Sequence, residues 1–147
     1  MKPIPIIAVA ALLSGCGTLS QLNAYDTGRA TADAQIEVQG RRMNLWFHRT
    51  EPQVLAGLTV ADAAGGGAIR GLTFGLAEGF KPDPRAIDTA LAAFLAPTGC
   101  RADPVRQIGG QSINFDARYS CPDGVDLRAM VIAQSSSLMR GEPIRTP

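Results

Sequence analysis

The chain of 147 residues contains one histidine, His48. Imidazole is the side chain whose ordinary pKa lies between pH 5 and 8, so histidine catalysis or histidine metal ligation would have to use this residue. Arginines and a tryptophan surround it, and these residue types are enriched in binding hot spots. The group consists of Arg41, Arg42, Trp46, His48 and Arg49. We interpret it as a candidate binding surface and assign no catalytic residue.

The sequence lacks the common motifs of catalytic and cofactor-binding loops. It has no Gly-x-Ser-x-Gly nucleophile elbow, no His-Glu-x-x-His metal motif and no dinucleotide fingerprint. Gly65-Gly66-Gly67 is not followed by the lysine and hydroxyl that a phosphate loop requires. The sequence therefore predicts a protein that is not an enzyme and that binds no cofactor.

The amino terminus has Lys2 followed by an apolar run from Ile4 to Leu13 and then Leu13-Ser14-Gly15-Cys16. The run is too short for a membrane-spanning helix, which needs about 20 residues, and its position behind a basic residue is typical of a secretory signal. The tetrad resembles the lipobox of bacterial lipoproteins, in which the cysteine becomes the acylated first residue of the mature protein. This resemblance implies a signal peptide over 1–15 and a membrane anchor of acyl chains on Cys16.

The residue after the lipobox cysteine is Gly17. By resemblance to the sorting of enteric lipoproteins, a residue other than aspartate at this position implies export to the outer membrane. We therefore expect a lipid-anchored protein that faces the periplasm, with inner-membrane retention as the alternative.

Acylation of Cys16 leaves two cysteines, Cys100 and Cys121. Cysteine pairs persist as disulfides in an oxidising compartment. Two cysteines and one histidine cannot form the usual tetrahedral zinc site, so no metal site is expected. The pair predicts a structural disulfide that closes a loop of about 22 residues and stabilises the fold by roughly 3 kcal/mol.

The composition fits one small domain. Removal of residues 1–15 takes away Lys2 and leaves 13 basic and 13 acidic residues, so the mature chain has no net charge. Nucleic-acid binding requires clustered cationic contacts to phosphates, so we expect no nucleic-acid partner. Hydrophobic residues make up 46% of the chain and aromatic residues 5%, which permits a light core held by a disulfide.

The pattern of residues predicts an α+β fold: small antiparallel sheets, one main amphipathic helix over about 84–96, and a C-terminal β-meander. Residues 34–60 alternate as strands do, with Met43, Leu45 and Phe47 on one face. Asp83 and Pro84 are good residues for a helix start. Further strands are predicted over 105–108, 113–121 and 125–133, with Asp116–Arg118 and Asp126–Arg128 as charge pairs on solvated strand faces.

We divide the chain into a signal peptide (1–15), an acylated cysteine with a flexible tether (16–33), a single domain (34–134) and a disordered tail (135–147). The tether and tail lack a sustained apolar period. No family resemblance is identified for the domain itself.

Glycines recur every four residues at Gly67, Gly71, Gly75 and Gly79. On a helix this spacing places small residues along one stripe, and the pattern resembles the glycine zipper of some outer-membrane lipoproteins. A short Ala-rich helix followed by a Gly-rich loop is the alternative for residues 61–80. A zipper would predict oligomerisation through these glycines.

These observations predict a lipid-anchored accessory protein that tethers, scaffolds or assists assembly of a cell-envelope complex. Its expected partners are the membrane, through the acyl chains, and an envelope protein of unspecified identity. A small periplasmic enzyme or ligand-binding lipoprotein acting on cell-wall or lipid material is one alternative. The zipper-mediated oligomer is the other.

Overall fold

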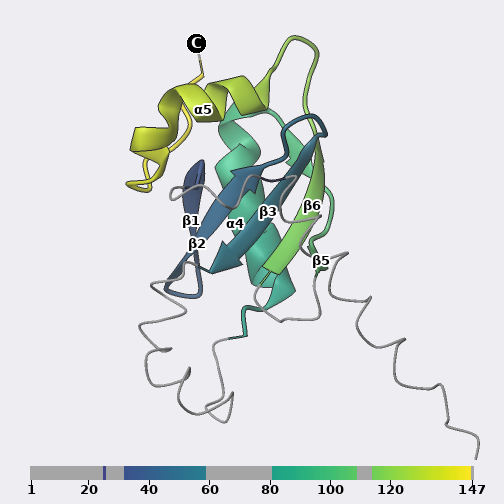
Figure 1. Ribbon diagram of the computed structural model, residues 1–147, viewed down its shortest axis with the longest axis vertical. Helices are drawn as coiled ribbons and strands as arrows, with labels where there is room; N and C mark the ends of the chain where they lie inside the picture. Colours follow the sequence, from purple (N-terminus) through teal and green to yellow (C-terminus); the bar gives the residue numbers. More distant parts are fainter. Residues whose placement is uncertain (1–24, 26–31, 59–80, 109–113, 147) are drawn as a thin grey trace, which may run out of the picture.

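The computed structural model describes Tyr25 and residues 32–58, 81–108 and 114–146, which form an antiparallel sheet with helices on it (Figure 1). The predicted α+β class is confirmed. The elements are β1 (Ala34–Val38), β2 (Arg41–Phe47), β3 (Gln53–Leu58), α4 (Pro84–Leu95), the short 3₁₀ helix η1 (Ala96–Thr98), β4 (Arg101–Ala102), β5 (Arg106–Gln107), β6 (Asn114–Ser120) and α5 (Leu127–Leu138). The strand order is β1-β2-β3-β6-β4, and β5 also pairs with β6.

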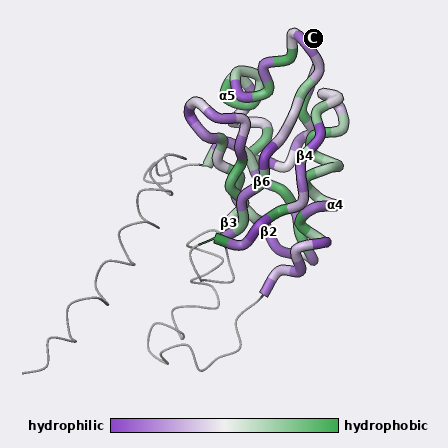
Figure 2. Tube along the Cα trace, turned by 90° about the vertical axis from the view of Figure 1, so that its right-hand side faces the viewer, coloured by the Kyte–Doolittle hydropathy of each residue, from purple (hydrophilic) through white to green (hydrophobic). Residues whose placement is uncertain are grey.

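Strands β1, β2 and β3 form a meander whose side chains alternate between two environments. Met43, Leu45 and Phe47 are buried, as their spacing predicts. The tube in Figure 2 changes repeatedly between hydrophilic and hydrophobic colours along these strands. Gln39 and Gly40 both have positive φ, 52° and 72°, which is the backbone of a tight two-residue hairpin turn.

Helix α4 covers one face of the sheet and lies behind it in Figure 1. The Asp83 carboxylate accepts a hydrogen bond from the Arg85 backbone N–H at 3.0 Å, and Pro84 occupies the first helical position, so the predicted helix start is confirmed. Ile87, Leu91 and Leu95 are buried in the core. We call the sheet face toward α4 the core face.

The opposite side of the sheet is the second face. One row across the strands pairs Trp46 with Leu55 and Leu55 with Asp116. The neighbouring row, Leu45 with Ala56 and Ala56 with Phe115, lies on the core face. Side chains of adjacent residues on a strand point to opposite sides of the sheet, so the two rows belong to different faces.

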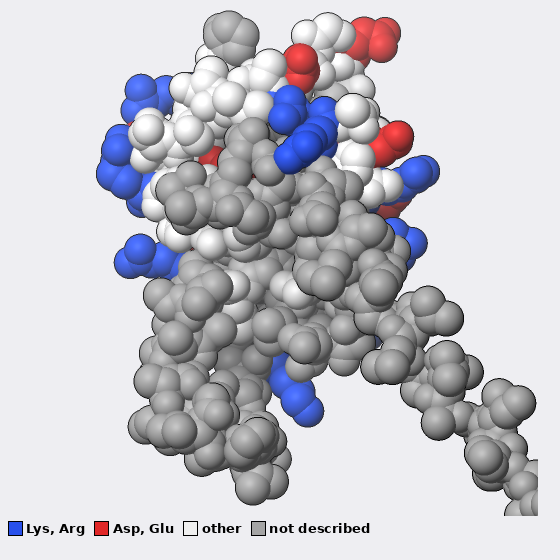
Figure 3. Space-filling model, viewed as in Figure 1, with Lys and Arg blue, Asp and Glu red and all other residues white. Residues whose placement is uncertain are grey.

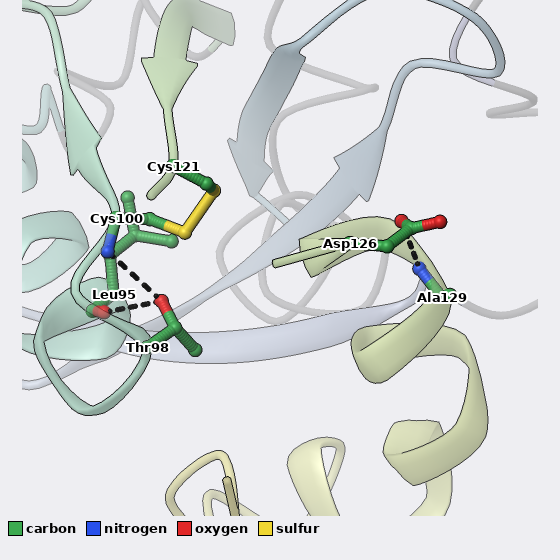
Figure 4. The surroundings of a disulfide bond; sticks show 6 residues. All are labelled: Leu95, Thr98, Cys100, Cys121, Asp126 and Ala129. Carbon is green, nitrogen blue, oxygen red and sulfur yellow. Dashed lines mark hydrogen bonds between the residues drawn. A yellow bond between two sulfur atoms is a disulfide. The ribbon is translucent and has the colours of Figure 1, made fainter. Parts of the chain in front are cut away.

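The predicted disulfide between Cys100 and Cys121 is confirmed, with the two Cα atoms 4.1 Å apart. It joins the exit of the helical segment α4–η1 to the end of β6 (Figure 4). The Thr98 hydroxyl donates to the Leu95 carbonyl oxygen at 2.7 Å and accepts from the Cys100 N–H at 3.3 Å. These bonds fix the chain as it leaves the helix and leads into the disulfide.

The predicted strand over 125–133, and with it the predicted C-terminal β-meander, is wrong: these residues lead into helix α5. The Asp126 side chain caps the helix by accepting from the Ala129 N–H at 3.0 Å (Figure 4), so it does not form the expected strand pair with Arg128. Leu127, Val131 and Leu138 are buried. Their spacing of four and seven residues places them on one side of a helix, which covers core that a strand would leave exposed.

The predicted disorder of the tail is also wrong for residues 135–146. Helix α5 extends to Leu138, and Ile144 is buried in the core. The Gln134 side-chain amide donates to the Arg145 carbonyl oxygen at 2.9 Å and accepts from the Arg145 N–H at 2.8 Å. The tail is therefore held along α5 by a two-point hydrogen bond.

Neither α4 nor α5, the two α-helices in the described part of the chain, is long and apolar enough to span a membrane.

Candidate functional site

The residues predicted to form a binding surface are spread along β2 and the turn that follows it. Arg41 begins the strand and Phe47 ends it, so six steps of extended backbone, about 20 Å, separate Arg41 from the turn that holds His48 and Arg49. Arg42 lines a hollow of about 580 Å³ bordered by β1, α4 and the turn after α5. His48 and Arg49 lie at the other end of the strand. The structure thus places these residues in different surroundings and does not bring them together in one pocket.

Tyr25 packs on the second face, although it falls inside the predicted flexible tether. Only 4% of this residue is exposed. Its hydroxyl donates to Gln53 Oε1 at 2.9 Å, and its ring contacts the His48 ring edge-to-face at a centroid distance of 5.1 Å. The chain is therefore fastened to the domain well before residue 33.

His48 is held in place by the turn between β2 and β3. Its Nδ1 accepts the backbone N–H of Thr50 at 3.2 Å and of Glu51 at 2.9 Å. A neutral imidazole that accepts at Nδ1 carries its proton on Nε2. The turn thereby fixes the ring orientation that Tyr25 packs against.

Asp116 lies on the second face with only 7% of the residue exposed. Its Oδ2 forms an ion pair with the Arg106 guanidinium at 2.8 Å, whereas Oδ1 has no hydrogen-bond partner in the part of the chain that the structure describes. The expected solvated Asp116–Arg118 pair is wrong, because the observed register places Arg106 of β5 opposite Asp116. A buried carboxylate oxygen without a partner is costly, and a bound donor would satisfy it.

Burial raises the pKa of the Tyr25 hydroxyl to about 12, and the nearby Asp116 carboxylate adds to the increase. Arg106 and Arg118 oppose it by favouring the phenolate. The pKa of Tyr119 is also raised, first by burial and then by Asp126. Tyr25 is thus a neutral hydrogen-bond donor at neutral pH.

These side chains border a pocket of about 420 Å³ on the second face, which we call the Tyr25 pocket. It is lined by Tyr25, His48, Gln53, Arg106, Gln107, Ile108 and Asp116. Hydrogen-bond donors and acceptors both face it, so its chemistry suits a small polar molecule. Of these seven residues, the sequence-based prediction of a binding surface included only His48. It missed the other six because strand register and the packing of Tyr25 on the second face bring them together.

A third concave surface lies where the β2–β3 turn, the end of β6 and α5 meet. This α5 groove has a volume of about 1000 Å³. Its lining includes Arg49 and Arg128 together with the acidic Glu51 and Asp126, and the apolar Ile132, which is 43% exposed. Ile132 is the one large hydrophobic residue that is exposed among the described residues, so the groove offers apolar contact beside arginines.

The described charges on the face in Figure 3 lie at separate places, with acidic groups among the basic ones. Among the residues with described positions, no group of three histidine, cysteine or acidic side chains could hold a metal ion. Cys16 and the glycines at 67, 71, 75 and 79 lie outside the described residues, so acylation and the zipper stay predictions.

Comparison of the chain with protein-family models, with curated proteins and with solved structures finds no match. Its function must therefore be inferred from its own residues.

Proposed function

We propose that this chain is a lipoprotein of the bacterial envelope. The acyl chains of Cys16 would hold it at the membrane, and its domain would act as an accessory protein that binds an envelope partner. The observation that carries the proposal is the Cys100–Cys121 disulfide, because it uses two of the three cysteines and leaves the lipobox cysteine for acylation. Disulfides of this kind persist in oxidising compartments such as the periplasm.

The α5 groove supports the role of partner binding. It combines the exposed Ile132 with Arg49 and Arg128, and the buried Nε of Arg128 has no hydrogen-bond partner among the described residues. Protein interfaces are enriched in arginine around apolar centres. A partner that covers this groove would bury Ile132.

The anchor is tested by intact-mass measurement of the full chain extracted from membranes of a bacterial host. We expect a mass that begins at Cys16 and includes acyl chains, and we expect Cys16→Ala to lose both the acylation and the membrane fraction. An unmodified amino terminus in the wild-type protein would refute the proposal.

The interaction role is tested by photo-crosslinking in the same cells, with a photoreactive residue at position 132. The matched control position is Thr89, which is exposed on α4 away from the groove. We expect one defined crosslinked partner from position 132 and not from position 89. Equal, diffuse crosslinking from both positions would contradict a role for the groove.

A small-ligand binder is a second candidate, favoured by the unpaired, buried Oδ1 of Asp116 beside the Tyr25 pocket. Soluble cell-wall muropeptides are suitable probes, because they carry amide and hydroxyl donors. This candidate predicts a rise in melting temperature with muropeptides that Asp116→Asn abolishes. No shift in the wild-type protein would exclude these ligands.

A further inference from the structure

Tyr25 lies close in sequence to the proposed anchor residue Cys16, so its packing on the domain limits the distance between the anchor and the domain. Nine residue steps separate it from Cys16. An extended chain spans at most 3.3–3.6 Å per residue, so Tyr25 lies no more than about 30 Å from the Cys16 backbone, however the residues between them are arranged. The point at which the chain is fastened to the domain therefore sets how far the domain can stand from the bilayer.

A second fixed point follows at Asp33. Its N–H donates to the Leu45 carbonyl oxygen at 2.9 Å, and its carboxylate accepts from the Phe47 N–H at 2.8 Å. Seventeen residue steps separate Asp33 from Cys16, which corresponds to an upper limit of about 60 Å. Releasing Tyr25 while Asp33 stays in place would thus double the greatest possible distance between anchor and domain.

We infer that Tyr25 is a clasp: it fastens the membrane tether to the second face and thereby limits the distance between the domain and the bilayer. The inference rests on the proposed function, because it requires acyl chains on Cys16. A partner or ligand that displaced Tyr25 from its contacts with His48 and Gln53 would lengthen the tether without unfolding the sheet.

The contacts of Tyr25 are built for a specific seat. Its ring packs against His48, whose own orientation is fixed by two backbone N–H groups, and its hydroxyl reaches Gln53. Gln53 lies beside Arg118 of β6, so the seat spans two neighbouring strands. Only 4% of Tyr25 is exposed, and its hydroxyl has Gln53 as a hydrogen-bond acceptor. A residue of a tether that did not bind the domain would be largely exposed.

The test uses the full acylated protein in lipid vesicles that contain a dansyl-labelled lipid. Trp46 is the only tryptophan of the chain and lies on the second face, so energy transfer from Trp46 to the labelled lipid reports the distance to the bilayer. Tyr25→Ala removes both contacts, Tyr25→Phe removes only the hydroxyl, and Tyr119→Phe is the matched control at the other tyrosine. Emission in vesicles without the dansyl lipid corrects for direct effects on Trp46.

We expect Tyr25→Ala to reduce energy transfer at least twofold, Tyr25→Phe to give a smaller reduction and Tyr119→Phe to match the wild type. Equal transfer in the wild type and a folded Tyr25→Ala variant would overturn the clasp. A wild-type protein that does not attach to vesicles would instead count against acylation, that is, against the proposed function.

Nitration of tyrosines tests the clasp without a membrane. We expect Tyr25 to react more slowly than the half-buried Tyr119 in the native protein. Faster reaction of Tyr25 would show that it is not seated on the second face and would refute the inference.

Discussion

The two faces of the sheet are both buried in part, but by different means. The core face presents residues such as Leu45 and Phe115 to the apolar side chains of α4 and α5. The second face buries Leu55 together with Tyr25 and Asp116, and its contacts include hydrogen bonds and an ion pair. The core face depends on filled volume, whereas the second face depends on the placement of a few polar groups. Substitutions that create cavities should therefore destabilise the core face most, and substitutions that remove a single polar partner should destabilise the second face most.

The sharpest comparison uses two buried leucines on neighbouring strands, Leu45 on the core face and Leu55 on the second face. We expect Leu45→Ala to lower the free energy of unfolding by about 3–5 kcal/mol and Leu55→Ala by about 2–3 kcal/mol, because the polar surroundings of Leu55 can relax into the cavity. Urea unfolding followed by circular dichroism measures both. An equal or larger loss for Leu55→Ala would show that the second face is packed as tightly as the core.

Removal of the disulfide should affect both faces alike, because a crosslink acts mainly on the entropy of the unfolded chain. The double variant Cys100→Ser/Cys121→Ser is expected to lose about 3 kcal/mol of unfolding free energy. Hydrogen exchange can compare the amides of helix α4, which packs on the core face, with those of β5, whose Arg106 pairs with Asp116 on the second face. A loss of protection confined to one face would contradict the expectation.

The ion pair of the second face is expected to matter less. Arg106→Ala leaves the buried Asp116 carboxylate without its partner and should cost about 1–2 kcal/mol, a value limited because 69% of the Arg106 side chain is exposed. The double variant Arg106→Ala/Asp116→Ala should lose no more than the single one, since no unpaired charge remains. Urea unfolding of Arg106→Ala, Asp116→Ala and the double variant provides the double-mutant cycle, and additive losses would refute this account.

The smallest effect is expected from the Tyr25 hydroxyl. Tyr25→Phe should cost about 0.5–1.5 kcal/mol at neutral pH. The pKa of Tyr25 is about 12 in the folded protein against an ordinary 10.0, so the folded state holds this proton more tightly than the unfolded state. The corresponding stability is fully present below pH 10 and is lost as pH rises from 10 to 12.

Phenolate absorbance measures this titration directly, because the chain has only two tyrosines. Tyr25→Phe should remove the step near pH 12, and Tyr119→Phe should retain it. A Tyr25 step at its ordinary pKa would show that the second face does not bury this hydroxyl.

Local sequence signals predicted one helix correctly and missed the other for a definable reason. Asp83 and Pro84 mark the start of α4, and an apolar stripe of period 3.6 follows them. In α5, apolar residues at 127, 129 and 131 satisfy the strand period as well as part of the helix period, so the local pattern is ambiguous. The strand interpretation overlooked Asp126, which is a good helix-cap residue and caps α5 in the structure. The helix is favoured because it allows Leu138 and Ile144 to be buried in the core.

The second-face site was less predictable than the fold. A tight turn at Gly109-Gly110 would place Arg106 opposite Ile113, but the observed register places it opposite Asp116. Register depends on the whole sheet, because a shift of an odd number of residues moves every side chain to the other face. The packing of Tyr25 on the second face depends on His48 and Gln53, which lie more than 20 residues later in the chain. No local sequence pattern predicts such a contact.

The two-point hydrogen bond between Gln134 and the Arg145 backbone has a practical consequence for protein engineering. The bond lies next to Ile144, which is buried in the core. A version of the protein that ends at Leu138 would lack Ile144, would expose the apolar residues that Ile144 covers, and would become prone to aggregation. Affinity tags and reporter fusions should accordingly be joined beyond residue 146, where they would leave the packing of Ile144 intact.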